Sequence, residues 1–509
     1  MKRQIRKIIA SMLAVTMVLS NSDLAVFAEE AGSKNQSVMV EEQQEEEKQE
    51  EQQQENESDT QPEEKQEEQQ EETEVSGEEQ PENQTEVSDN DSEKVNLTLE
   101  LLSDEGTENE TIRTVEDFVK LSKSAPEDYQ DKTIILAPHD TEEWDLSGTE
   151  FAGLGSDAYP FKGEIGFSGE YTGYITLDKS LFNAISGDAK INSTLNLRAA
   201  DNMTDPILAK RYVAGENADS SSQTIHLNID AESKAATEEK DKYSSFGGII
   251  GTLGKDASVS LEVFSIIPTA ETAVSGEGNK GFFCNTMEEG SSLKLTSFTG
   301  SADFNVVSTD QVAGALVGYM AANANLTVGT EFAYSGSVTG AQNAGGLVGV
   351  TKAGAQIILQ GNYTVSGSIT SGNGNAGGLI GLAENNPVSI MDEKKVSVTN
   401  ASLSANGTSG AAGGLLGFAT ISQEDQSLDL SVYSVDGVTI TSGQYAGGAF
   451  GVLQNGAEND GKHTYTIMMG IGENNGNVSS TGDGVENYGG LIGKYEAKNL
   501  ASALNLKDL

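Results

Sequence analysis

The sequence is poor in the residues on which most enzymes and metalloproteins depend. Its 509 residues include one cysteine, Cys284, and three histidines, His139, His226 and His463. A single cysteine excludes an internal disulfide. No His-Glu-x-x-His pattern, Gly-x-Ser-x-Gly elbow or phosphate-binding glycine loop occurs. We therefore expect no zinc protease within these residues, no metal site and no cofactor.

Basic residues are also scarce. Lys and Arg total 31 against 79 Asp and Glu, which gives a net charge of -48. Because binding to phosphate backbones needs a positive surface, this balance argues against a nucleic-acid partner. After residue 28 no apolar run approaches the roughly 20 residues that a membrane-spanning helix requires. We expect no membrane span in the mature chain.

The N-terminus has the pattern of a secretory signal peptide over residues 1–28. Four basic residues precede an apolar run at 8–19, and small residues end at Ala28, with Glu29 as the expected first residue of the mature chain. A retained membrane anchor is the alternative, although the apolar run is short for one. The signal predicts a secreted protein.

Residues 29–94 consist almost entirely of Glu, Gln, Ser, Asn and Thr. Such a segment buries too little apolar surface to offset the entropy of ordering, so we expect it to be disordered. It can serve as a plain linker, or as an acidic spacer that holds the following residues away from an acidic cell envelope.

Glycine, in contrast, is abundant, and it recurs in a fixed motif. The hexapeptide Ala-Gly-Gly-Leu-Val-Gly at 344–349 has related copies at 246–251, 313–318, 376–381, 412–417, 446–451 and 488–493. The period is about 33 residues, which indicates a repeat architecture. The glycines that we assign to the structural repeat are Gly248, Gly281, Gly346, Gly378, Gly414, Gly448 and Gly490.

One copy of the motif is degenerate. It reads Lys280-Gly281-Phe282-Phe283-Cys284, and we align Cys284 with the closing glycine of the other copies. Cys284 is then a buried small residue of the stack, or alternatively a catalytic thiol.

Each repeat contains three short β-prone runs separated by Gly and Asn, and no helical period survives. Stacked repeats would pair each strand with its equivalents and bury one continuous core. Paired glycines allow a tight turn where a Cβ atom would clash. The sequence therefore predicts an all-β fold, a right-handed parallel β-helix over residues 131–509.

Residues 95–130 differ from the repeats and are expected to form a small α/β cap on the N-terminal end of the coil. Residues 95–102 alternate as a strand does, and Thr114 begins a capping box that predicts a short helix at about 115–124. Residues 200–242 are polar and interrupt the repeat, so we expect a loop inserted from one turn of the coil.

The motif resembles the glycine-leucine-glycine ("GLUG") repeat of bacterial surface adhesins, and similar repeats precede the catalytic domain of some immunoglobulin-A metalloproteases. The resemblance covers about residues 131–509. Residues 144–148 and 160–163 are similar to the way that this family enters its coil, whereas 164–169 depart from the usual Asp-Gly-Asn turn. The resemblance implies a parallel β-helix and a surface protein, and no activity.

We expect a secreted, surface-displayed, non-enzymatic adhesin or stalk of a larger protein, on the cell surface of a Gram-positive-type bacterium. Its partners would be glycans or surface proteins of a host or the environment, with cell-wall association through sequence downstream of residue 509. One alternative is a carbohydrate-active β-helix enzyme. Its candidate residues are Asp303, Asp310, Lys394 and Lys395. Another alternative is the N-terminal stalk of a secreted metalloprotease whose catalytic domain lies downstream.

Overall fold

The computed structural model describes residues 109–507 with internal gaps. The gaps fall at 140–142, 170, 202, 217–222, 232–244, 268–272, 300–301, 386–387, 391–393, 422–425, 430–431, 457–463, 469–476, 481–486 and 499–502. The signal peptide with its cleavage site at Ala28 and Glu29, the acidic segment 29–94, the strand expected at 95–102, and His463 all lie outside the described residues.

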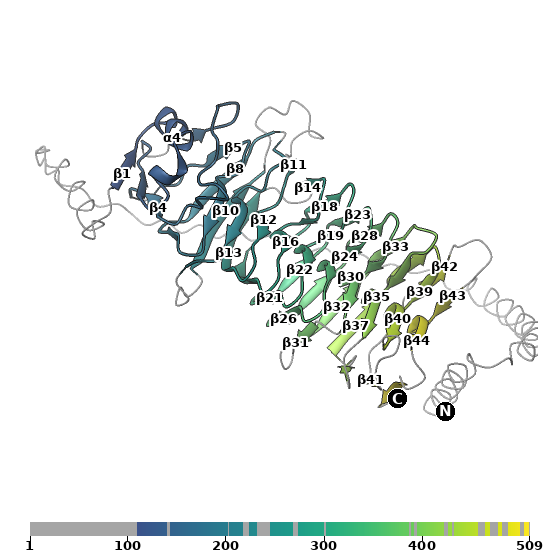
Figure 1. The fold of residues 1–509 in the computed structure, drawn as a ribbon. Coiled ribbons are helices and arrows are strands. Elements are labelled where there is room, and N and C mark those ends of the chain that lie inside the picture. The colour runs from purple at the N-terminus through teal and green to yellow at the C-terminus, as the bar shows by residue number, and fades with distance from the viewer. Residues whose placement is uncertain are drawn as a thin grey trace, which may run out of the picture. The chain divides into compact units, whose positions relative to one another are not determined.

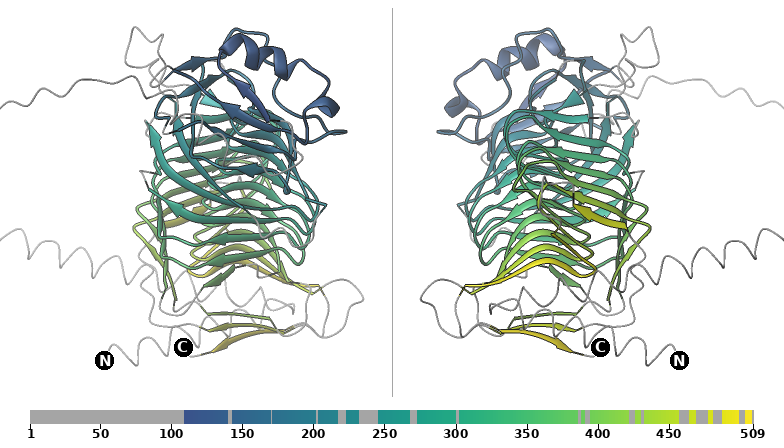
Figure 2. Two further views of the ribbon diagram at one scale, coloured as in Figure 1. Left: turned by 90° about the vertical axis from the view of Figure 1, so that its left-hand side faces the viewer. Right: turned by 90° about the vertical axis from the view of Figure 1, so that its right-hand side faces the viewer.

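The described residues form a parallel β-helix, as the sequence predicts (Figure 1). The chain coils so that each strand pairs in parallel with its equivalent in the next turn, as in β25 with β30. Figure 2 shows these turns stacked on one another. We call one turn of the coil a rung.

Four sheets run along the coil. The ten-stranded sheet consists of β6 (Phe182–Ser186), β9 (Ala209–Val213), β12 (Ile250–Leu253), β16 (Cys284–Met287), β20 (Val317–Met320), β25 (Val348–Thr351), β30 (Ile380–Glu384), β35 (Leu416–Ile421), β40 (Phe450–Asn455) and β44 (Ile492–Ala497). The nine-stranded sheet consists of β3 (Trp144–Asp145), β5 (Ile175–Leu177), β8 (Leu195–Ala199), β10 (Thr224–Asp230), β13 (Ser258–Ile267), β17 (Ser292–Phe298), β21 (Asn325–Val328), β26 (Gln356–Leu359) and β31 (Val388–Ile390). The eight-stranded sheet consists of β11 (Ser245–Phe246), β14 (Ala273–Gly276), β18 (Asn305–Ser308), β23 (Ser337–Gly340), β28 (Ser368–Ser371), β33 (Ser402–Ala405), β38 (Thr439–Ser442) and β42 (Asn477–Ser480). The seven-stranded sheet consists of β15 (Lys280–Gly281), β19 (Ala313–Gly314), β24 (Ala344–Gly345), β29 (Ala376–Gly377), β34 (Ala411–Gly413), β39 (Tyr445–Gly447) and β43 (Asn487–Gly489).

Three smaller sheets complete the described strands. One contains β1 (Asn109–Ile112), β2 (Thr133–Leu136), β4 (Glu164–Phe167) and β7 (Lys190–Ile191). A second contains β22 (Phe332–Tyr334), β27 (Tyr363–Val365), β32 (Val396–Thr399) and β37 (Tyr433–Asp436), and a third contains β36 (Gln426–Asp429), β41 (Thr464–Met468) and β45 (Ala503–Lys507).

A central rung therefore has five short strands, β24 to β28, rather than the three that the sequence suggested. The motif itself supplies two of them, because the chain turns between Gly345 and Val348. The apolar run at 363–370 supplies two more, because it bends at Gly367. A Cβ atom at Gly367 would lie 1.7 Å from the carbonyl oxygen of Gly336 in the preceding rung, so only glycine fits at this corner.

Apolar side chains of equivalent position stack along the inside of the coil. In the ten-stranded sheet Ile380 pairs with Leu416, Leu416 with Phe450, and Phe450 with Ile492. All four side chains are buried, as is Leu347 of the neighbouring column. Ring stacking adds to this core, since Phe332 and Tyr363 of successive rungs lie parallel with centroids 5.7 Å apart.

The second glycine of the motif sits where two rungs approach most closely. A Cβ atom at Gly346 would lie 2.1 Å from the carbonyl oxygen of Gly378, and the same approach recurs at Gly378 and Gly414. Gly448 donates its N–H to the oxygen of Gly489 at 3.2 Å. Gly490, in the last copy, has open space around its Cα atom.

The alignment of the degenerate copy was wrong by one residue. Gly281 pairs with Gly314, the first glycine of the next copy, and Cys284 pairs with Val317. Phe282 therefore stands at the second glycine position, and Asn285 at the closing glycine. Phe282 is accommodated because its ring packs into the core against Phe304, with centroids 4.0 Å apart.

The cap helix is confirmed as α4 (Val115–Ser122), followed by a 3-10 helix, η2 (Pro126–Asp128). Thr114 caps α4, because its Oγ1 accepts a hydrogen bond from the Asp117 N–H at 3.1 Å. Phe118 is buried, and its ring lies 5.9 Å from that of Trp144 and 5.2 Å from that of Phe151. The cap thus covers the first rung with aromatic side chains.

The prediction of an inserted loop at 200–242 is wrong for the residues of that segment that the structure describes. Strand β9 pairs with β6 and β12, and strand β10 pairs with β8 and β13, so both belong to the coil. In β10 the side chains of Ile225, Leu227 and Ile229 are buried, whereas the alternate residues are polar. A strand that faces the core on one side needs only every second residue to be apolar.

Candidate functional site

The residues proposed for a carbohydrate-active site are not gathered in one place. Asp303 precedes β18 and Asp310 follows it, at the opposite end of the strand. Lys394 and Lys395 precede β32, which belongs to a different sheet. The carboxylate of Asp310 accepts the N–H of Gly278 at 2.7 Å, and the Lys395 N–H donates to Asn362 Oδ1 at 3.0 Å. These contacts hold turns of the coil.

The two described histidines, His139 and His226, and the cysteine lie apart from those residues. His139 is exposed, and His226, on β10, stacks on Phe264 with ring centroids 5.6 Å apart. Its Nδ1 lies 3.0 Å from Glu262 Oε2. Cys284 is buried, and burial raises the pKa of its thiol to about 12. Such a thiol stays protonated at neutral pH and is a poor nucleophile. Within the described ranges no three His, Cys, Asp or Glu side chains are grouped to hold a metal ion.

A charge network that the sequence did not indicate joins β8, β10 and the residue before β3, with Arg198 and Asp230 largely buried and Glu143 exposed. Arg198 Nη2 lies 2.6 Å from Asp230 Oδ2, and Nη1 lies 3.0 Å from Glu143 Oε2. The guanidinium also lies over the ring of Tyr174, 4.7 Å from its centroid. Burial lowers the pKa of Arg198, but its hydrogen bonds to Asp230 and Glu143 outweigh burial and raise it. The arrangement is structural, because every charge has a protein partner.

The outward side of the eight-stranded sheet carries hydroxyl groups in two parallel columns. We call it the hydroxyl face. Its first column is Ser337, Ser368, Ser402 and Thr439, and its second is Thr339, Thr370, Ser404 and Thr441. The residues between them, Val338, Ile369, Leu403 and Ile440, are buried in the core. Because parallel strands lie about 4.8 Å apart, each column repeats a hydroxyl group at that interval. The Ser/Thr-x-Ser/Thr alternation in the sequence could have located this face.

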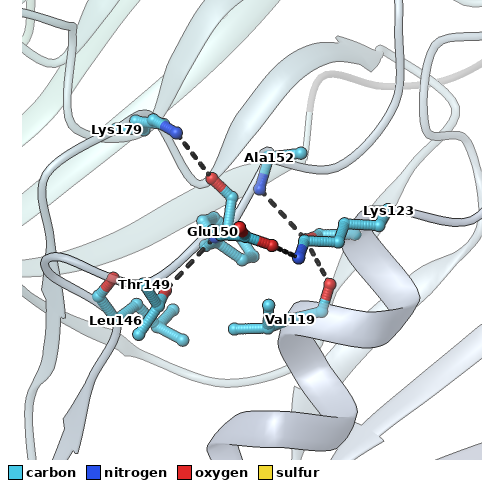
Figure 3. Close-up of polar contacts among 9 residues, drawn as sticks. Val119, Lys123, Leu146, Thr149, Glu150, Ala152 and Lys179 are labelled. Carbon is cyan, nitrogen blue, oxygen red and sulfur yellow. Dashed lines mark hydrogen bonds and ion pairs between the residues drawn. The ribbon is translucent and has the colours of Figure 1, made fainter.

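The cap carries a hollow of about 570 Å³ beside α4, which we call the cap hollow. It is lined by Val115, Glu116, Val119, Lys120, Lys123, Ser124 and Thr149. Figure 3 shows Lys123 reaching from the helix to the carboxylate of Glu150, which is hydrogen-bonded to it. This hydrogen bond lowers the pKa of Glu150.

The loop that forms the far wall of the cap hollow is held in place by several hydrogen bonds (Figure 3). Lys179 Nζ donates to the carbonyl oxygen of Phe151 at 3.2 Å, and the Ala152 N–H donates to Ser122 Oγ at 3.0 Å. Thr149 Oγ1 donates to the carbonyl oxygen of Leu146 at 2.6 Å. These bonds tie the loop to Ser122 of α4 and to Lys179.

Comparison with protein-family models, with curated proteins and with solved structures finds no match for the chain. Among the helices of the described ranges, none is both long and apolar enough to cross a membrane.

Proposed function

We propose that this chain is the secreted, surface-displayed β-helix of a non-enzymatic adhesin, or of the stalk of a larger surface protein. The observation that carries the proposal is the hydroxyl face, a regular array of Ser and Thr side chains repeated rung after rung. An array of this kind repeats hydrogen-bonding groups along one side of a stiff coil, although the hydroxyl groups of Ser337 and Ser404 already donate to Asn305 Oδ1 and Asn406 Oδ1, each at 2.6 Å. Such groups suit extended partners that are themselves rich in hydroxyl groups, such as glycans.

The signal-peptide pattern and the resemblance to the GLUG repeat support secretion and surface display. A parallel β-helix supports a stalk role on physical grounds. Each rung is held by its neighbours through backbone hydrogen bonds and a shared apolar core, so the coil resists bending without disulfides. The chain has a single cysteine and so no internal disulfide, which is consistent with a coil stiffened by backbone pairing and core packing.

The location of the native protein tests the surface part of the proposal. An antibody against the repeats should detect the protein in the cell-wall or medium fraction of the source cells and not in the cytosol. A wall-bound band much larger than the chain would assign these residues to a stalk. A cytosolic band of full size would contradict the proposal.

Glycan binding tests the role of the hydroxyl face. The double variant Thr339→Val/Thr370→Val keeps side-chain shape and removes two adjacent hydroxyl groups, so binding to a responsive glycan on an array should weaken about fivefold or more. The matched control is Thr327→Val, on the outward side of β21 in the nine-stranded sheet. If the control weakens binding as much as the double variant, the hydroxyl face is not the binding surface.

A further inference from the structure

The cap hollow combines an apolar floor with cationic groups, which is the composition of a site for a small amphipathic anion. Val115 and Val119 lie on one side of α4 and contribute the apolar surface. Lys120 and Lys123, one turn or less further on, add two ammonium groups, against one glutamate in the lining. Pockets that pair an apolar surface with a few converging polar groups are the usual form of ligand sites.

The charge of the hollow stands out against the rest of the chain. Acidic residues outnumber basic ones by 79 to 31 over the whole sequence, so two lysines in one small hollow are unusual here. A third lysine, Lys179, is fixed on the neighbouring loop and interacts with Glu150 through its charge. The hollow and the neighbouring loop therefore carry three lysines against two glutamates, Glu116 and Glu150, and this excess of one positive charge favours an anionic ligand.

Lys123 is already paired with a carboxylate, that of Glu150. This pair indicates that the hollow can bind a carboxylate group of a ligand. Glu150 has 84 % of its side chain exposed, so the pair is solvated and weak. A ligand carboxylate that was also packed on the valines could replace Glu150 at Lys123. Glu150 would then act as an internal competitor for the site.

We propose that the cap hollow binds a carboxylate-bearing sugar residue, with its ring on Val115 and Val119 and its carboxylate at Lys123 and Lys120. Ser124 Oγ donates to the carbonyl oxygen of Lys120 at 3.2 Å, which leaves it able to accept a hydrogen bond from a sugar hydroxyl. The site lies on the cap and is separate from the hydroxyl face. It does not depend on the proposed role of that face.

The experiment measures binding of an oligogalacturonate and of its uncharged methyl ester to the full secreted chain by calorimetry. We expect the acid to bind and the ester to bind at least tenfold more weakly. Lys123→Gln should weaken acid binding about tenfold, because a charge-assisted hydrogen bond is lost. Glu150→Gln should tighten it, because the competing carboxylate is gone.

Lys255→Gln is the matched control, because Lys255 forms an exposed pair with Glu289 at 3.1 Å on a turn of the coil. It should leave acid binding unchanged, and all variants should keep the thermal midpoint of the parent chain. Equal weakening by Lys123→Gln and Lys255→Gln would show non-specific attraction and overturn the site, as would equal binding of acid and ester. Binding of a poly-glutamate peptide with the same dependence on Lys123 would overturn the assignment to a sugar. None of these outcomes alters the test of the hydroxyl face.

Discussion

At the scale of single residues, the coil depends on positions where a charged or larger side chain does not fit. Leu379 is an example, because it follows the paired glycines and has only 1 % of its surface exposed. Its backbone N–H and carbonyl both join ladders with neighbouring rungs, at 2.8 Å to Leu415 O and 2.8 Å from Leu347 N. The side chain therefore cannot move outward without breaking backbone pairing.

We predict that Leu379→Lys lowers the free energy of unfolding by about 4 kcal/mol, because an ammonium group would be buried without a partner. Thermal and denaturant unfolding of the purified chain would measure this. Ser368→Lys, on the exposed hydroxyl face one rung away, is the control and should change stability by less than about 0.5 kcal/mol. A Leu379→Lys chain with the parent's midpoint would contradict the buried assignment.

Burial and hydrogen bonding also predict that Cys284 is unreactive. Its Sγ lies 3.3 Å from the carbonyl oxygen of Thr286, to which the thiol donates, and its pKa of about 12 follows from burial. The degenerate copy uses this small, apolar side chain to fill the column that valine and isoleucine occupy in adjacent copies.

At the scale of elements, the cap helix depends on its tertiary contacts. Helix α4 is only 8 residues long, so it has little stability of its own. Its position comes from Phe118 between two aromatic rings and from the Ser122 hydroxyl, which accepts the Ala152 N–H. The end of a β-helix would otherwise expose apolar side chains and unpaired strands.

We predict that Phe118→Ala lowers stability by about 3–4 kcal/mol and makes the chain self-associate, because the cap no longer covers the first rung. Light scattering at increasing protein concentration would detect the association. Thr114→Ala removes only the helix cap and should cost about 1 kcal/mol without association. If Phe118→Ala lost stability and remained monomeric, the cap would contribute packing alone and would not shield the end.

At the scale of the whole molecule, the fold is a one-dimensional array in which each rung contacts the rungs before and after it. Pairing in the ten-stranded sheet runs in one unbroken order from β6 to β44. Stability in such arrays is close to a sum of rung terms and neighbour terms. A local defect is therefore transmitted mainly to adjacent rungs.

We predict that Leu379→Lys increases amide hydrogen exchange in β25, β30 and β35 and leaves β9 and β12 protected. Those first three strands are the mutated rung and its two partners, whereas the last two lie further along the array. Exchange measured by mass spectrometry on peptic fragments would resolve the difference. A uniform rise in exchange from β9 to β44 would show that the coil opens as one cooperative unit.

The sequence by itself determined the period, the parallel coil and the cap helix. These features follow from local patterns: the paired glycines recur at one phase, and the Thr114 hydroxyl caps the helix by accepting the Asp117 N–H. At Gly346, Gly378 and Gly414 an added Cβ atom would lie 2.0–2.1 Å from a carbonyl oxygen of the next rung. Only glycine fits at these positions, so the repeat can be recognised in the sequence.

Only the tertiary structure decided the features that depend on which residues meet across rungs. These are the register of the degenerate copy, the strands β9 and β10 in a segment that looked like a loop, the pairing of Arg198 with Asp230, and the position of the cap hollow. The physical reason is the same in each case. The partners are about 30 residues apart in the chain, and a one-residue difference in alignment changes both the partner and the face that a side chain occupies.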